Sequence, residues 1–182
     1  MTKKQTAALS RMIRREISRF DGDDTIQAGV HAAYDRYIVT DGTAAIILPE
    51  MPDTLRKGSQ MDSIYDVIRR NMENADHILA DTVTADHIRT WKQLAKPWKA
   101  GKDAKTGAIP VEITAQNDYI TITGFYNPCC LIDAVDAIGA GAMLYLGRGK
   151  CSGFPSLLVY PKDWMAQRAF AFGYVLPLRI LG

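Results

Sequence analysis

The sequence predicts an α+β fold, and three observations support this. Residues 3–20 carry apolar side chains at spacings of three and four, so Leu9, Met12 and Ile13 fall on one helical face. Short alternating segments flank turn signals such as Asp41-Gly42, as is typical of antiparallel strands. From residue 82 onward the predicted order is helix, hairpin, helix and then strands, so the two kinds of element occur in blocks.

The first third of the chain predicts one helix followed by a hairpin. The helix is expected to stop at the polar run 21–24. Asp41-Gly42 predicts a tight turn, because Gly adopts positive φ without strain and Asp tolerates it. Prolines and glycines mark a connector at 49–59, and 61–72 has a weak helical pattern that also fits an extended linker. The expected strands are 26–30, 36–40 and 45–48.

The remainder predicts two further helices and two groups of strands. Thr84 is a suitable N-cap for a helix that Pro97 is expected to end. Asn127-Pro128 is expected to open a helix that ends near Gly139. Asn117-Asp118 is the expected turn of a hairpin. The expected strands are 111–114, 119–123, 143–146, 156–160 and 169–176.

Composition points to a folded cytoplasmic protein. The chain has 182 residues, of which 47% are hydrophobic and 23% charged, and a formal net charge of +2. No apolar run approaches the roughly 20 residues that span a bilayer, so no membrane partner is expected. Cys129 and Cys130 are adjacent and Cys151 stands alone, which gives no disulfide framework and favours a reducing compartment. The predicted division is a basic helix plus hairpin at 1–60, a connector at 61–80 and a C-terminal domain at 81–182.

Three segments of the C-terminal domain resemble one known family. Phe125-Tyr126-Asn127-Pro128-Cys129-Cys130-Leu131-Ile132-Asp133-Ala134 opens a helix, Phe154-Pro155-Ser156-Leu157-Leu158-Val159 begins a strand, and Phe172-Gly173-Tyr174-Val175-Leu176-Pro177-Leu178-Arg179-Ile180 closes the chain. In this order they resemble the last domain of the bacterial DNA polymerase III beta subunit, the DNA sliding clamp. Upstream, Tyr65-Asp66-Val67-Ile68 and Asp41-Gly42 are similar to the family's connector and Thr-Asp-Gly turn.

The resemblance implies a DNA clamp-like, processivity-type domain with helices packed on antiparallel sheets. Such proteins perform no bond chemistry, so neither catalytic residues nor cofactors are expected. Departures from the family also matter: a full clamp chain has three domains, this chain has room for one and a half, and a hairpin is missing between Thr123 and Phe125. A closed ring would therefore need more chains, and a homo-oligomer is expected.

Basic side chains on the first two helices are the candidate contacts to duplex DNA, as the resemblance implies. The first helix carries six cations against Glu16 alone, a net charge of +5. The alternative is that these are ordinary solvated faces of amphipathic helices, and Asp133 and Asp136 on the third helix argue against a uniformly basic channel. The predicted set is Lys3, Lys4, Arg11, Arg14, Arg15, Arg89, Lys92 and Lys96.

The resemblance also implies a hydrophobic cleft that accepts a short peptide from a DNA polymerase or another client. The alternative is that the apolar final strand is ordinary core. The predicted cleft residues are Val67, Pro155, Tyr174, Leu176, Pro177 and Leu178.

Other motifs carry weaker signals. Gly147 to Gly153 lacks the spacing of a phosphate-binding loop and predicts a hairpin loop, because a strand is expected to follow. The tetrapeptide Ala-Asp-His-Ile occurs at 75–78 and 85–88 without further metal ligands nearby in the sequence, and no metal site is predicted. Three hypotheses result: a clamp-like processivity factor, a non-encircling interaction module of the clamp fold from a phage or mobile element, and an enzyme of unrecognised type.

Overall fold

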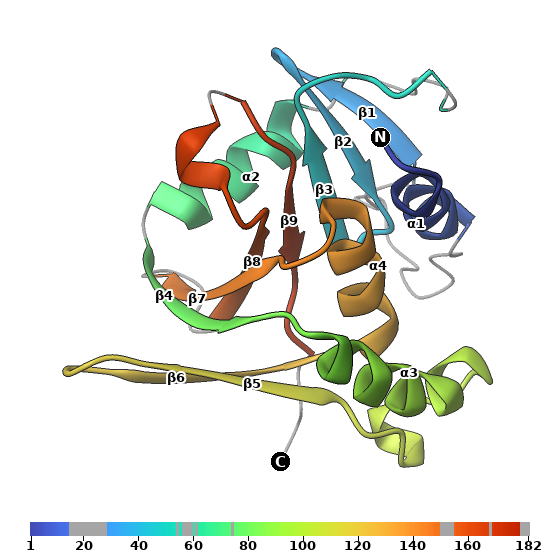
Figure 1. The fold of residues 1–182 in the computed structure, drawn as a ribbon, viewed down its shortest axis with the longest axis vertical. Coiled ribbons are helices and arrows are strands. Elements are labelled where there is room, and N and C mark those ends of the chain that lie inside the picture. Colours follow the sequence, from blue (N-terminus) through green and yellow to red (C-terminus); the bar gives the residue numbers. More distant parts are fainter. Residues whose placement is uncertain are drawn as a thin grey trace.

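The computed structural model describes residues 1–14, 29–53, 55, 60, 62–73, 75–149, 155–167 and 169–178. Within these residues the chain combines helices with antiparallel sheets, which confirms the predicted α+β class (Figure 1). The helices are α1 (Lys3–Arg14), α2 (Asp62–Glu73), α3 (Ala85–Lys99) and α4 (Pro128–Ile138), with short 3₁₀ turns at Ala104–Thr106 and Trp164–Ala166. The strands are β1 (Gly29–Ala33), β2 (Arg36–Thr40), β3 (Ala44–Leu48), β4 (Ala75–Thr82), β5 (Val111–Gln116), β6 (Thr121–Tyr126), β7 (Met143–Gly149), β8 (Pro155–Tyr160) and β9 (Phe172–Val175).

One seven-stranded sheet contains strands from both the N-terminal and the C-terminal parts of the chain. Its order is β1-β2-β3-β9-β8-β7-β4, and every neighbouring pair is antiparallel. The β3–β9 pair, in register at Ile46 and Gly173, links strands of the predicted segments 1–60 and 81–182. β5 and β6 form a separate hairpin that extends away from the rest of the molecule (Figure 1).

Helices cover both faces of the large sheet. Successive strand residues point to opposite faces, so Val39 and Ile46 belong to a different core cluster from Ile38 and Ile47. The first cluster includes the buried side chains of α1 and α4, which lie side by side, and Trp91 of α3. The second lies beneath α2. The basic helices and α2 therefore lie on opposite sides of the sheet.

Local signals predicted most element boundaries. The Thr84 side chain accepts a hydrogen bond from the His87 amide and begins α3, and Asn127 accepts from the Cys129 amide and begins α4. The hairpin at Asp41-Gly42 is confirmed by the pairing of β2 with β3. Of the two alternatives for 61–72, the helical one is correct. The predicted stop at 21–24 and residues 15–20 of the first helix lie outside the described residues.

One expectation was wrong, and one strand was not predicted. Pro97 does not end α3, which continues to Lys99. Pro97 lies in the last turn and removes only the bond that its own amide would have donated, while its carbonyl still accepts from the amides of Ala100 and Lys102. Strand β4 was missed because its sequence carries Asp76, His77 and Asp81 in place of a regular apolar alternation. It is an edge strand with a register shift, and charged residues are common at such edges.

None of the helices in the described ranges is long and apolar enough to cross a membrane.

Candidate functional site

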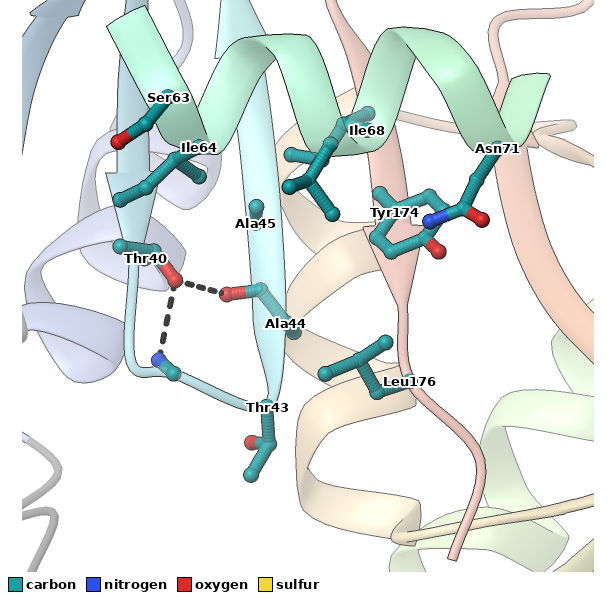
Figure 2. Close-up of a pocket in the computed structure, with 12 residues that line it drawn as sticks. Thr40, Thr43, Ala44, Ala45, Ser63, Ile64, Ile68, Asn71, Tyr174 and Leu176 are labelled. Atoms are coloured by element: carbon teal, nitrogen blue, oxygen red, sulfur yellow. Dashed lines mark hydrogen bonds between the residues drawn. The ribbon is translucent and has the colours of Figure 1, made fainter. Parts of the chain in front are cut away.

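The first candidate surface is an apolar cleft at α2, here named the α2 cleft. It lies between α2, the turn that joins β2 to β3, and the end of β9 (Figure 2), and its volume is about 290 Å³. Its lining is Thr40, Gly42, Thr43, Ala44, Ala45, Ser63, Ile64, Val67, Ile68, Asn71, Tyr174 and Leu176.

The turn that forms one wall of the α2 cleft is held in a fixed shape by side-chain hydrogen bonds. The buried Asp41 carboxylate accepts from the amides of Thr43 and Ala44 at 2.9 and 2.8 Å. The Thr40 hydroxyl donates to the Ala44 carbonyl at 2.8 Å and accepts from the Gly42 amide at 3.0 Å (Figure 2). Gly42 has a φ of +83°, which glycine adopts without strain. This wall is therefore preformed.

The opposite wall and the floor of the α2 cleft are apolar. Ile64 and Ile68 on α2 are buried toward the sheet, whereas Val67 is 56% exposed and Leu176 43% exposed at the opening. The Leu176 amide donates to the Thr43 carbonyl at 2.9 Å, so the chain beyond β9 is attached to the turn. Exposed aliphatic groups beside a preformed hollow can accept an apolar side chain from a partner.

Tyr174 and Asn71 lie together at one end of the cleft (Figure 2). Burial raises the pKa of the Tyr174 phenol above its ordinary value, so this group stays neutral at physiological pH. A neutral phenol beside an amide offers hydrogen bonds but no general base.

The structure brings together three of the six predicted cleft residues, namely Val67, Tyr174 and Leu176. Pro155 lies at the start of β8, where its carbonyl accepts from the Tyr126 hydroxyl at 3.0 Å. Leu178 donates its amide to the Phe125 carbonyl at 2.7 Å, and neither it nor Pro177 lines the cleft. Sequence reasoning missed Ile64 and Ile68, which the helical spacing of 64, 68 and 71 could have indicated.

The second candidate surface is a basic groove between α1, α3 and the start of α4, with a volume of about 890 Å³. It is here named the basic groove. Its lining is Lys4, Arg11, Arg14, Lys92, Lys96, Trp98, Lys99, Asn127, Cys129, Ile132, Asp133 and Asp136. The groove thus collects cations from two helices that are separated by 70 residues or more in the sequence.

The cations of the basic groove fall into two groups. On α1, the Arg11 guanidinium pairs with Asp133 at 2.6 Å and with Asp136 at 3.1 Å, and Lys4 pairs with Asp136 at 2.8 Å. The cations of the second group form no ion pair with any other residue in the described part of the chain. They are Arg14, Lys92, Lys96 and Lys99.

Five of the eight predicted DNA-contact residues line the basic groove, namely Lys4, Arg11, Arg14, Lys92 and Lys96. Lys3 is exposed on α1 outside this lining, and Arg15 lies outside the described residues. Arg89 pairs with Asp86 and borders a neighbouring hollow. Lys99 was not in the predicted set, although it extends the series of Lys92 and Lys96 by one helical turn.

The remaining motifs occupy structural positions. Cys130 is buried on the inner side of α4, with its sulfur 3.1 Å from the Thr43 hydroxyl. The two Ala-Asp-His-Ile copies fold differently, at 75–78 in β4 and at 85–88 in α3. β7 ends at Gly149 and β8 begins at Pro155, so a strand follows the glycine-rich segment, whose residues 150–154 lie outside the described ranges.

Comparison with protein-family models, curated proteins and solved structures finds no match to this chain.

Proposed function

We propose that this chain is a small clamp-like tethering protein. In this proposal the α2 cleft holds a short apolar peptide of a replication protein, and the basic groove contacts the phosphates of duplex DNA. The observation that carries the proposal is the meeting of Val67, Tyr174 and Leu176 at one cleft. The clamp resemblance selected these residues from segments more than 100 positions apart. The Thr-Asp-Gly turn at 40–42, which forms the wall opposite α2, is a separate segment that also resembles the family.

The α2 cleft suits an extended peptide with one or two aliphatic or aromatic anchors. The turn is already fixed by its own hydrogen bonds, and the bond from the Leu176 amide to the Thr43 carbonyl holds the chain after β9 against it. Both reduce the loss of conformational entropy that binding would require. Its opening carries Val67 and Leu176, which a bound side chain would cover. Full burial of one such anchor contributes roughly 1.5–3 kcal/mol.

The basic groove supports the DNA part of the proposal. Lys92, Lys96 and Lys99 follow one another along a single face of α3 at spacings of four and three. Within the described ranges these three lysines form no ion pair, and such a row of cations, here named the α3 row, can follow a phosphate backbone without reading sequence, because phosphates are the same at every base pair. We expect steep weakening of DNA binding by salt.

A second candidate keeps the peptide cleft and omits encirclement of DNA. The observation that favours it is the β5–β6 hairpin, which forms a two-stranded sheet of its own and does not extend the large sheet. The chain is then a monomeric or dimeric interaction module that competes for client peptides.

Peptide binding tests the function that both candidates share. The probe is a short fluorescent peptide with adjacent Leu and Phe in a polar sequence, and its partner probe has Ala at both positions. We expect the variant Val67→Ser with Leu176→Ser to lose about tenfold or more in affinity for the first probe. The matched control, Ile109→Ser with Met165→Ser, removes two exposed apolar side chains elsewhere and should bind normally. Equal binding of both probes, or of both variants, would exclude the α2 cleft as the peptide site.

Solution mass then separates the two candidates. Light scattering at low and moderate salt should give one discrete multimer if the protein encircles DNA, since encirclement by several copies requires a closed oligomer. A monomer at all accessible concentrations would exclude the ring and retain the interaction module.

A further inference from the structure

Two buried aspartates on α4 lie at the floor of the basic groove. Asp133 is 4% exposed and Asp136 7% exposed, and their spacing of three places them on one face of the helix, toward α1. An ionised carboxylate at such depth needs a cationic partner to offset its loss of hydration. α1 supplies it, because Arg11 contacts both carboxylates and Lys4 contacts Asp136.

The cations that form ion pairs with these two aspartates, Arg11 and Lys4, are partly exposed on the wall of the groove. The side chains of Arg11 and Lys4 retain 47% and 66% of their accessible surface. They therefore lie where a phosphate backbone would pass, yet their charges are already directed at carboxylates within 3.1 Å. Six cations and two carboxylates line the groove, which leaves a net charge of +4.

We propose that Asp133 and Asp136 limit the strength of DNA binding by holding Arg11 and Lys4 away from phosphates. The inference rests on the proposed association of the basic groove with duplex DNA. A cation that is neutralised within the protein releases no counterion from DNA. Each cation withheld in this way therefore reduces the steepness of the plot of log binding constant against log salt concentration by about 0.9. The α3 row then carries the contact, and DNA is held loosely enough to move along the groove.

A purely structural role for the aspartates makes a different prediction. α1 is already fixed on α4 by the fully buried Leu9 and Met12 and by a hydrogen bond from the Gln5 amide group to the Ile138 carbonyl at 3.3 Å. If the ion pairs only add to this packing, their removal lowers stability and leaves DNA affinity unchanged. If they limit DNA binding, their removal raises it.

The experiment compares three proteins on a fluorescent duplex of arbitrary sequence across a salt series. The first is the wild type. The second is Asp133→Asn with Asp136→Asn, which keeps side-chain size and one acceptor oxygen at each position while removing the two charges. The third adds Lys4→Gln and Arg11→Gln to the second and thereby restores the net charge of the wild-type groove. Circular dichroism establishes that each protein is folded.

We expect the double variant to bind DNA roughly tenfold or more tightly at 0.1 M salt, with a salt slope steeper by almost 2. The fourfold variant should return to the wild-type affinity and slope. If the double variant does not fold, Asp136→Asn alone should steepen the slope by almost 1, because it releases the exposed Lys4.

Each contrary result has its own meaning. Wild-type affinity in a folded aspartate variant would overturn the inference while leaving DNA association intact. An equally tight fourfold variant would overturn it too, because the gain would then not come from Lys4 and Arg11. Absence of DNA binding in all the proteins would overturn the proposed DNA association and the inference together.

Discussion

The hydroxyl of Tyr126 donates a hydrogen bond to the carbonyl of Pro155 at 3.0 Å and so joins β6 to β8. Tyr126 is fully buried, and burial raises the pKa of its phenol far above the ordinary value. The contact connects the projecting hairpin to the large sheet. It also gives Pro155 a structural task away from the α2 cleft.

Tyr126→Phe should therefore destabilise the protein. The substitution leaves the Pro155 carbonyl without this donor, at a cost of about 1–2 kcal/mol in the free energy of unfolding, as measured in urea. Tyr119→Phe is the matched control, since Tyr119 is 94% exposed and its loss of a hydroxyl should change nothing. A Tyr126→Phe protein as stable as the wild type would show that the bond contributes no net stability.

The same ring makes Gly124 sensitive to substitution. A Cβ at Gly124 would lie 2.7 Å from Cζ of Tyr126, closer than real contacts allow. Because Tyr126 has no exposed surface, its ring cannot move aside freely, and Gly124→Ala should cost roughly 1–3 kcal/mol in thermal or urea unfolding. Thr121→Ala, on the exposed face of the same strand, is the control and should cost far less. Equal losses in the two variants would show that the ring accommodates the methyl group.

The contact between Tyr126 and Pro155 could not have been predicted from the sequence, because it joins two strands whose proximity no local pattern specifies. Turn and cap signals are local, so Asp41-Gly42, Thr84 and Asn127 predicted their structures correctly. The pairing of β3 with β9 joins residues more than 120 positions apart, and no local pattern specifies such a partner. Pro155 was placed in the cleft by position relative to a motif, whereas its actual neighbour is set by strand register.

The candidate surfaces follow the same division. Helical spacing predicted the basic faces of α1 and α3, but not that Arg11 and Lys4 would turn toward aspartates on α4. Val67 and Leu176 entered the predicted cleft through the family resemblance, because their exposure in the fold cannot be derived from an apolar residue alone.

The buried phenol of Tyr160 should make the protein less stable in alkaline solution. Burial raises the pKa of its phenol from 10.0 to about 12. In the unfolded chain the phenol ionises near pH 10, so its contribution to stability is fully present below that pH and is lost as pH rises toward about 12. Urea unfolding at pH 8 and at pH 11 should therefore give a lower free energy at pH 11.

Tyr160→Phe should reduce this alkaline loss without abolishing it, because burial also raises the pKa values of Tyr126 and Tyr174. Tyr119→Phe serves again as the exposed control and should keep the full wild-type dependence on pH. If Tyr160→Phe has the same pH dependence as the wild type, the phenol of Tyr160 is not protected from ionisation in the fold.

Thr84→Ala should weaken α3 and with it one wall of the basic groove. The Thr84 hydroxyl accepts from the His87 amide, and the His87 ring accepts from the Thr84 amide, so the two residues form a reciprocal cap. Loss of the hydroxyl should cost about 0.5–2 kcal/mol in the free energy of unfolding, whereas Thr84→Ser should cost much less. Hydrogen exchange at the first turn of α3 should rise in the Ala variant alone. Equal exchange in the Ala and Ser variants would show that the hydroxyl does not hold the helix start.

Charge reversal on α3 should separate DNA binding from peptide binding. Lys92 and Lys96 line the basic groove without an ion pair in the described residues, so they are better targets than Lys4 and Arg11, whose loss would expose carboxylates. Lys92→Glu with Lys96→Glu should weaken binding to a duplex at 0.1 M salt by at least about tenfold and flatten the salt dependence by almost 2. The matched control is Arg70→Glu with Lys162→Glu, which changes the net charge equally at exposed positions outside the groove lining.

The protein with Lys92→Glu and Lys96→Glu should bind the apolar peptide as the wild type does, because the α2 cleft lies on the other side of the sheet from α3. Equal loss of DNA binding in the two variants would mean that net charge alone drives association and that the groove has no special part in it. Unchanged DNA binding in the α3 variant would move the DNA contact to another surface, and the clamp-like arrangement of basic helices facing DNA would then be wrong for this protein.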